Sequence, residues 1–224
     1  MRSESDPLTA ELFERLSDAR PSQESVAEGA VLLHGFAKPF ESDLLADISD
    51  VVERAPFRHM VTPGGHQMSV AMTNCGGVGW VTDRSGYRYD ANDPEAGRPW
   101  PAMPRSFLEL AERAADRGGF PDFMPDACLI NRYEPGAKMS LHQDKDEQDF
   151  GAPIVSVSLG LPAIFLFGGL KRSDRPRRFR LQHGDVVVWG GPARLAFHGV
   201  APLAVGEHAL LGRQRINLTF RKAR

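Results

Sequence analysis

Residues 154–167 read IVSVSLGLPAIFLF and contain two short apolar runs, 154–159 and 163–167, with the length and composition of β-strands. Five more runs of this kind lie between residue 126 and the C-terminus, at 128–133, 178–181, 186–189, 195–198 and 215–221. Turns rich in Gly and Pro separate them, and no helical pattern intervenes. About seven successive strands predict a β-sandwich or jelly roll.

The sequence before residue 126 is different in character. Apolar residues recur at helical spacing in 42–52 and again in 108–115, so we expect a helix in each place. Between them, residues 56–104 are rich in Gly, Pro and aromatic side chains, which suits short strands and long loops that form a surface lid. Residues 1–25 are polar and charged, and we expect a loosely held tail with one short helix around 8–16. The predicted organisation is a tail (1–25), an N-terminal part with helices and lid (26–125) and a mainly β core (126–224).

The composition limits the classes of protein to consider. The chain has 224 residues, of which 25% are charged, and its formal net charge is −2, so any contact with nucleic acid must come from a local patch. Cys75 and Cys128 are far apart and lack zinc-ligand spacing, which indicates a reducing compartment. No run approaches the roughly 18 apolar residues of a membrane span, and the N-terminus lacks the apolar core of a signal peptide. We expect a cytoplasmic monomer that does not bind a membrane.

The motif His-x-Asp occurs twice, as His142-Gln-Asp144 and as His183-Gly-Asp185. Residues two apart on a strand point to the same face, so either pair could bring an imidazole and a carboxylate to one metal ion. The second pair looks like a turn that leads into the buried run 186–189, which indicates a structural role. The first pair has no such explanation. A further histidine would complete a two-histidine, one-carboxylate site for Fe(II) with coordination positions left open.

Two histidines are the main candidates for that further ligand. His198 ends the apolar run 195–198 and precedes a glycine, at a strand terminus where sites are built. His208 lies in a polar turn and is expected to be exposed. The pattern favours His198. His34, His59 and His66 fall outside the β region and are weaker candidates.

The last predicted strand, Arg215–Arg221, has the features of a carboxylate-binding surface. Alternation places Arg215, Asn217, Thr219 and Arg221 on one face, and the apolar residues between them on the other. Two guanidinium groups suit bidentate binding of carboxylates, and 2-oxoglutarate has a carboxylate at each end. In the run 128–133, Asn131 and Tyr133 share one face and offer further donors. An edge strand with a solvated polar face would show the same alternation.

Together these residues resemble the AlkB family of iron and 2-oxoglutarate dioxygenases. The resemblance covers about residues 28–221, and its most specific part is the string Asn131-Arg-Tyr-Glu-Pro-Gly136 followed by His142-Gln-Asp144. It implies a double-stranded β-helix (jelly roll) with N-terminal helices, and a nucleotide-recognition lid formed by 56–104. It also implies Fe(II), with 2-oxoglutarate and O2 as cosubstrates. Residues 1–25 have no counterpart in the family, and His66 stands in the lid where a tyrosine is expected.

The resemblance also implies roles for single residues. The iron ligands would be His142, Asp144 and His198. Arg215 would bind the distal carboxylate of 2-oxoglutarate together with Tyr133, and Arg221 would lie near the carboxylate beside the keto group. Asn131 and Asn217 would add hydrogen bonds. Trp80 would stack the flipped base against His142, and Asp146 would face the exocyclic nitrogen of that base. Tyr87 and Arg172 would contact the nucleic-acid strand or the lesion.

The implied activity is oxidative demethylation of bases such as 1-methyladenine and 3-methylcytosine in single-stranded DNA or RNA, which releases formaldehyde, succinate and CO2. A methyl group on the pairing edge is hidden in a duplex, so the base must be unpaired or flipped out. Residues 171–180 hold six basic residues against one acid and are a candidate phosphate contact, although such a run is commonly a solvated hairpin. One alternative is an Fe(II)/2-oxoglutarate hydroxylase that acts on protein or a small molecule, which the iron and cosubstrate motifs fit equally. The other is a non-catalytic jelly-roll binding module, which would not need both sets of residues.

Overall fold

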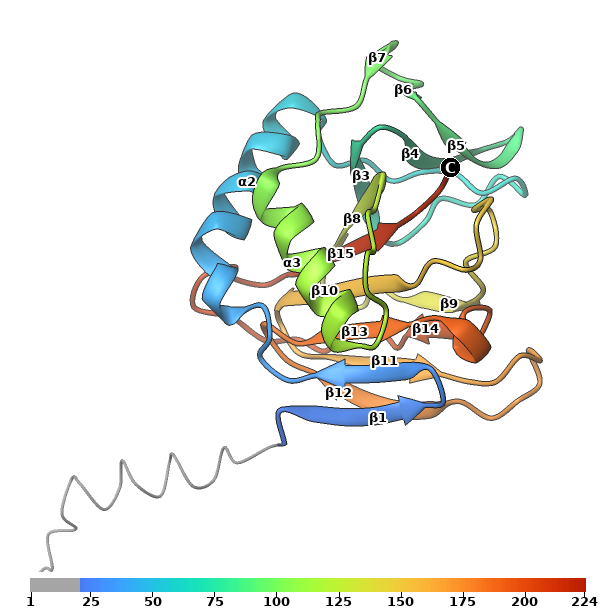
Figure 1. The fold of residues 1–224 in the computed structure, drawn as a ribbon. Coiled ribbons are helices and arrows are strands. Elements are labelled where there is room, and N and C mark those ends of the chain that lie inside the picture. The colour runs from blue at the N-terminus through green and yellow to red at the C-terminus, as the bar shows by residue number, and fades with distance from the viewer. Residues whose placement is uncertain (1–20) are drawn as a thin grey trace, which may run out of the picture.

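The computed structural model describes residues 21–224 (Figure 1). Its N-terminal elements are β1 (Gln23–Ala27), β2 (Ala30–Leu33), the 3-10 helix η1 (Lys38–Phe40), α2 (Glu41–Arg54), β3 (Ala71–Gly76), β4 (Gly79–Asp83), β5 (Gly86–Asp90), β6 (Asn92–Asp93), β7 (Arg98–Pro99) and α3 (Arg105–Arg117). They are followed by β8 (Ala127–Tyr133), β9 (Met139–His142), β10 (Ile154–Gly160), β11 (Ala163–Phe167), β12 (Arg177–Leu181), β13 (Val186–Trp189), the 3-10 helix η2 (Gly191–Ala193), β14 (His198–Val200) and β15 (Arg215–Arg221).

Two antiparallel sheets form the body of the protein. The larger sheet has the strand order β1-β2-β13-β10-β15-β8-β3, and the smaller has the order β12-β11-β14-β9. Apolar side chains of both sheets fill the space between them, among them Leu32, Trp189, Phe165 and Val200. The β4–β5 and β6–β7 hairpins stand apart from these sheets as a lid, beside the C-terminal end of β15 (Figure 1). The predicted mainly β jelly roll, with N-terminal helices and a lid, is confirmed.

The helices cover the outer face of the larger sheet (Figure 1). Leu44 of α2 and Phe107 of α3 belong to one buried cluster with Ile216, Leu218 and Phe220 of β15. Since successive residues on a strand point to opposite faces, packing these three residues under the helices turns the polar residues of β15 inward, between the two sheets. The alternation read from the sequence therefore grouped the residues of the two faces correctly, and the helices decide that the polar face is enclosed.

Strands from before residue 126 complete the larger sheet. Strand β2 pairs with β13, and β3 pairs with β8, so without them two strands of the core would have unpaired edges. Strands from both sides of residue 126 therefore belong to one sheet. Strand β1 begins at Gln23, so the last residues of the expected tail belong to the sheet. The short helix expected around 8–16 lies outside the described residues.

Two details near the expected metal site differ from the prediction. Residues 195–197 are not a strand, because the turn that begins in η2 continues through them, with the Ala196 N–H donating to Ala193 O. His198 therefore begins β14 instead of ending a strand. Strand β9 ends at His142, so Asp144 does not share a strand face with it and lies in the loop that follows. Within residues 21–224 no helix is long and apolar enough to cross a membrane.

Candidate metal centre and carboxylate pocket

Three side chains with metal-binding atoms meet at one end of the space between the sheets. Strands β9 and β14 pair with His142 directly opposite His198, so the two imidazole rings lie 4.4 Å apart between centroids. Asp144 Oδ1 lies 3.6 Å from His142 Nε2, and its Oδ2 lies 3.8 Å from His198 Nε2. One ligand atom from each residue lies within 4.8 Å of the other two, and this is the one such group in the part of the chain that the structure describes.

Hydrogen bonds orient both imidazoles for metal binding. His142 Nδ1 lies 2.8 Å from Ser140 O, and His198 Nδ1 lies 3.0 Å from Ala196 O. A carbonyl oxygen only accepts, so each Nδ1 donates its hydrogen and each Nε2 keeps a free lone pair toward Asp144. Burial, together with the neighbouring His142, lowers the pKa of His198 to about 4, which keeps this ring in the neutral form that a metal requires.

Asp144 is held in its ionised form. Burial alone would raise the pKa of this carboxyl group, but the charge of Arg221 and the two histidines outweigh burial and hold the pKa below its ordinary value. Arg221 donates from Nε and Nη2 to the same oxygen, Asp144 Oδ2, at 2.9 and 2.8 Å. The other oxygen remains open toward His142. The set therefore offers two imidazole nitrogens and one carboxylate, which suits a divalent transition metal such as Fe(II).

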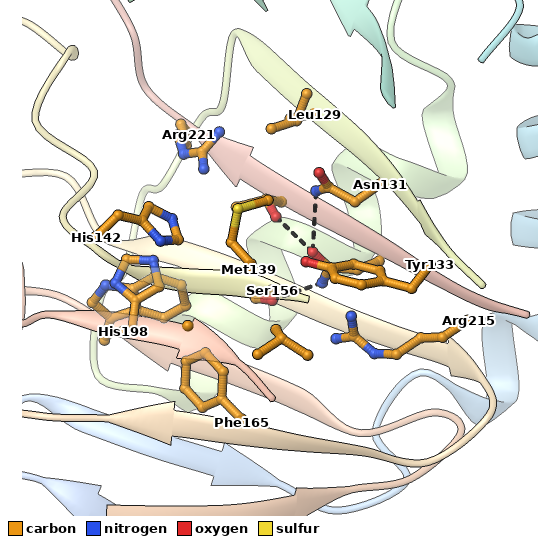
Figure 2. Close-up of a pocket in the computed structure, with 15 residues that line it drawn as sticks. Leu129, Asn131, Tyr133, Met139, His142, Ser156, Phe165, His198, Arg215 and Arg221 are labelled. Carbon is orange, nitrogen blue, oxygen red and sulfur yellow. Dashed lines mark hydrogen bonds between the residues drawn. The ribbon is translucent and has the colours of Figure 1, made fainter. Parts of the chain in front are cut away.

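A pocket runs from these histidines along the polar face of β15 to Arg215 (Figure 2). Asn131 and Tyr133 of β8 line the same pocket, as the sequence predicted, and so do Asn217 and Arg221. The two guanidinium groups lie at opposite ends, with Arg221 on the side of the histidines (Figure 2). A ligand with a carboxylate at each end matches this arrangement.

Arg215 is buried with unused hydrogen-bond donors. Only 1% of this residue is exposed, and its guanidinium carbon lies 4.9 Å from the ring centre of Tyr133. Its Nη2 donates to Ser158 Oγ at 2.9 Å, whereas Nε and Nη1 have no partner, and within residues 21–224 it forms no ion pair. Burial lowers the pKa of Arg215 from its ordinary value. Buried donors without acceptors are costly, so this end of the pocket is suited to an anionic ligand such as the distal carboxylate of 2-oxoglutarate.

The two asparagines in the pocket differ in how far their amides are occupied. Asn217 Nδ2 donates to Ser156 Oγ and Val157 O, both at 2.8 Å, and its Oδ1 accepts from Thr219 and from Asn131 Nδ2. Its amide is therefore fully engaged within the protein. Asn131 keeps its Oδ1 without a partner. Both residues were expected to add hydrogen bonds to the cosubstrate, but the unpartnered atom of Asn131 is an acceptor and 2-oxoglutarate offers only acceptors, so this free oxygen does not serve that role.

The lid hairpin lies against the loop that follows Asp144. Trp80 of β4 donates from Nε1 to Asp146 Oδ2 at 2.8 Å. Tyr87 of β5 is half exposed and stacks on Trp80, with ring centroids 5.7 Å apart. Trp100, by contrast, is buried and donates to Asp90 O. Trp80, Tyr87 and Asp146, all expected to contact the base, thus lie together beside the loop that contains Asp144.

Arg172, in the basic hairpin between β11 and β12, reaches the same region. Its Nη1 donates to Leu141 O at 2.8 Å, and its guanidinium lies 5.9 Å from the ring centre of Phe197. Leu141 and Phe197 immediately precede the two histidines of the metal group. An exposed cation is therefore fixed beside the candidate metal centre.

The second His-x-Asp motif holds loops together. His183 Nε2 lies 2.5 Å from Glu41 Oε2, and its Nδ1 accepts the Gly160 N–H. Asp185 accepts backbone N–H groups of Gly35 and Gln182 at 2.8 Å. These contacts agree with the expected structural role. His208, expected to be exposed, is partly buried and stacks on His183 at 4.5 Å, away from the metal group.

Three residues near the centre were not anticipated from the sequence: Tyr89, Glu147 and Arg194. Arg194 donates from Nη1 to the backbone oxygen of Asp144 at 2.8 Å and pairs with Glu147 Oε2 at 3.1 Å. Tyr89 donates to Glu147 Oε1 at 2.5 Å. Glu147 belongs to a charged run that looks solvated in the sequence, and no local signal marks any of the three.

Comparisons with known proteins agree with this geometry. Residues 29–221 match the model of the 2OG-Fe(II) oxygenase superfamily. The chain is 61% identical over 212 residues to the alpha-ketoglutarate-dependent dioxygenase AlkB of Escherichia coli, an alignment that covers 95% of this chain and 98% of that one. It is 58% identical to the AlkB of Salmonella typhimurium with the same coverage. The solved structure of OsALKBH1 superposes with a TM-score of 0.80 at 29% identity and covers 89% of this chain and 99% of that one.

Proposed function

Because the chain belongs to the AlkB family within the 2OG-Fe(II) oxygenase superfamily, we propose that it demethylates N-alkylated bases of nucleic acids oxidatively, with Fe(II) as metal and 2-oxoglutarate and O2 as cosubstrates. The observation that carries the proposal is the pocket itself. Two imidazoles and one carboxylate lie at one end, and a buried arginine with unused donors lies at the other. A binding module has no need for both.

We assign the residues as follows. His142, Asp144 and His198 hold the iron, and Arg215, with Tyr133 beside it, holds the distal carboxylate of 2-oxoglutarate. Arg221 lies at the metal end and orients Asp144 while it remains available to the second carboxylate. When bound, Fe(II) with 2-oxoglutarate and O2 supplies oxidising chemistry that releases CO2 and succinate and frees the methyl group as formaldehyde. The protein excludes water from this reaction, since Met139, Phe165 and Trp189 line the pocket.

The substrate residues lie at the mouth. We assign Trp80 to stack on the flipped base against His142, Asp146 to face its exocyclic nitrogen, and Tyr87 and Arg172 to contact the strand. A single-stranded DNA substrate fits best, because an unpaired base can enter without the cost of opening a duplex; RNA, or a duplex with a flipped base, would use the same contacts. We propose that the protein acts as a monomer, in the cytoplasm.

The test is a lesion panel. Oligonucleotides that carry 1-methyladenine or 3-methylcytosine, as DNA and as RNA, are incubated with enzyme, Fe(II) and 2-oxoglutarate, and formaldehyde and succinate are both measured. We expect the two products in equal amounts with methylated strands, and none with the Asp144→Ala variant. A hydroxylase acting on protein or a small molecule would form succinate at a rate that methylated oligonucleotides do not change, and that result would refute the proposal.

A further inference from the structure

The lid is joined to the metal centre by a pair of hydrogen bonds. Trp80 and Tyr89 are directly opposite each other in the β4–β5 hairpin, so their side chains share one face of it. Trp80 donates to Asp146 at 2.8 Å, and Tyr89 donates to Glu147 at 2.5 Å. The two acceptors are consecutive residues of the loop that begins at Asp144. One face of the hairpin is thus held to the loop that supplies the carboxylate ligand.

The two bonds differ in their environment. Asp146 is exposed, so water or an incoming base can replace the Trp80 N–H at its carboxylate. The side chain of Glu147 is only 2% exposed, and burial raises the pKa of Tyr89, so its hydroxyl stays protonated and donates. A hydrogen bond to a buried carboxylate is strong and has no competing water. Tyr89–Glu147 is therefore the lasting connection, and Trp80–Asp146 is the exchangeable one.

Glu147 carries the connection inward to Asp144 through two arginines. Its Oε1, the oxygen that accepts from Tyr89, also lies 3.4 Å from Arg221 Nε, and its Oε2 lies 3.1 Å from Arg194 Nη2. Arg221 binds the carboxylate of Asp144, and Arg194 binds its backbone oxygen. The side-chain carboxylate and the backbone oxygen of Asp144 are thus each held by an arginine that Glu147 orients.

We propose that Tyr89 and Glu147 are positioning residues that couple the order of the lid to the occupancy of the metal and cosubstrate site. When the lid hairpin is in place, the Tyr89 hydroxyl fixes Glu147 and, through Arg221 and Arg194, aligns Asp144. By reciprocity, a filled site that fixes Asp144 and Arg221 orders the hairpin. The lid is then prepared before a nucleic acid arrives. That an ordered lid helps to capture a base rests on the proposed function. The coupling between the lid and the metal and cosubstrate site needs no nucleic acid.

The experiment measures hydrogen–deuterium exchange of the amides of residues 79–90 without oxygen, with and without Fe(II) plus 2-oxoglutarate. In the wild type we expect loading to slow exchange by about fivefold or more, the range of ordinary coupling factors. Tyr89→Phe keeps the ring and loses only the donor, and we expect loading to have little effect on its lid. The matched control is Ser106→Ala, which removes a hydroxyl that donates to the carboxylate of Asp47 between the two helices and should keep the wild-type response.

The ratio of exchange rates with and without ligands separates coupling from simple loosening. If Tyr89 were merely structural, Tyr89→Phe would speed exchange of the lid both with and without ligands and leave the ratio of the two rates unchanged. That result would overturn the proposal. So would a wild-type lid whose exchange does not respond to loading. A second readout is Fe(II) affinity in the presence of 2-oxoglutarate, which should weaken in Tyr89→Phe and in Glu147→Gln and stay unchanged in Ser106→Ala. Neither readout uses a nucleic acid, so failure of the proposed demethylation would leave both results intact.

Discussion

The wall of the pocket and the lid that stands at its mouth are built in opposite ways. On β15, Arg215, Asn217 and Arg221 are each at most 6% exposed, and the strand lies between β10 and β8 in the larger sheet. In the lid, β4 and β5 pair as a two-stranded hairpin, and Tyr87 is 50% exposed. The wall fixes its polar groups by strand pairing on both sides, whereas the hairpin pairs with neither sheet: β4 packs on the core through Val81, and no residue of β5 is buried.

This difference separates the two binding tasks. A cosubstrate that is the same in every turnover is best held by donors whose positions are set before it binds, because no reordering then opposes binding. A base that must be taken from a strand needs an opening that can move, and segments with few buried contacts open at low cost in free energy. We therefore expect changes in the wall to act on metal and cosubstrate, and changes in the lid, apart from the contact of Tyr89 with Glu147, to act on the choice of base.

The largest effect is expected at the centre of the wall. Asp144→Ala removes a proposed metal ligand and leaves Arg221 buried without the carboxylate that it binds, so Fe(II) binding should be lost. Activity should fall by more than about 100-fold, because changing a residue that only supports a ligand already costs about 10- to 100-fold. The matched control is Asp185→Ala in the second His-x-Asp motif, which should cost about 1–3 kcal/mol of stability and leave Fe(II) affinity unchanged. Iron titration and thermal melting of both variants decide the assignment. Equal iron affinity in the two variants would contradict it.

The next effect is expected at the far end of the pocket. Arg215→Ala removes the buried guanidinium proposed to bind the distal carboxylate, a charge-assisted contact of about 1.5–3 kcal/mol, so the KM for 2-oxoglutarate should rise roughly ten- to hundredfold. Trp80→Ala is the contrasting lid variant, and it should raise the KM for the oligonucleotide while the KM for 2-oxoglutarate stays the same. If both variants changed both constants equally, the division between wall and lid would be wrong.

The wall could be predicted from the sequence because its signal is local. Strand periodicity alone places Arg215 and Arg221 on one face. That this face points inward follows from the helices that pack on the apolar residues between them. His198 was also predicted to join His142 and Asp144, and it lies beside them, although the reason was partly wrong. The apolar residues 195–197 resemble a strand, but Ala196 donates to Ala193 in a turn, Phe197 bonds to Gly168 and Gly169, and the strand begins only at His198.

The connection between lid and metal centre could not be predicted in this way. Tyr89 and Glu147 are 58 residues apart, and Arg194 lies 47 residues beyond Glu147. Glu147 follows Lys145 and Asp146, which are exposed, so its burial depends entirely on partners brought by the fold. The same is true of β2 and β3, whose places in the larger sheet are set by pairing with distant strands.

A smaller effect is expected from the exposed carboxylate at the mouth. Methylation at N1 of adenine or N3 of cytosine leaves a cationic base, and Asp146 and the ring face of Trp80 both favour a cation there. Asp146→Asn should therefore lower the ratio of kcat/KM for 3-methylcytosine over 3-methylthymine. Because Asp146 is exposed and screened by water, we expect only about a two- to fivefold change. Asp149→Asn, an exposed acid nearby, is the control, and a ratio unchanged in both variants would place the selectivity elsewhere.

The smallest effect is expected in the basic hairpin, where two arginines allow the contrast between fixed and free groups to be tested on one element. The guanidinium of Arg172 is held at Leu141 and Phe197 beside the metal group, whereas Arg180 is exposed at the other end of β12 and forms no ion pair with any described residue. A cation already held in place loses little side-chain freedom when it binds a phosphate, but a free one must be ordered first. Arg172→Gln should therefore raise the KM for a methylated strand about two- to threefold. The slope of log KM against the logarithm of the salt concentration should fall by about one, which corresponds to one released counterion. Arg180→Gln should change neither quantity. Equal effects of the two variants, disappearing together at high salt, would mean that the strand is attracted along the whole of β12 and that the placement of Arg172 has no special value.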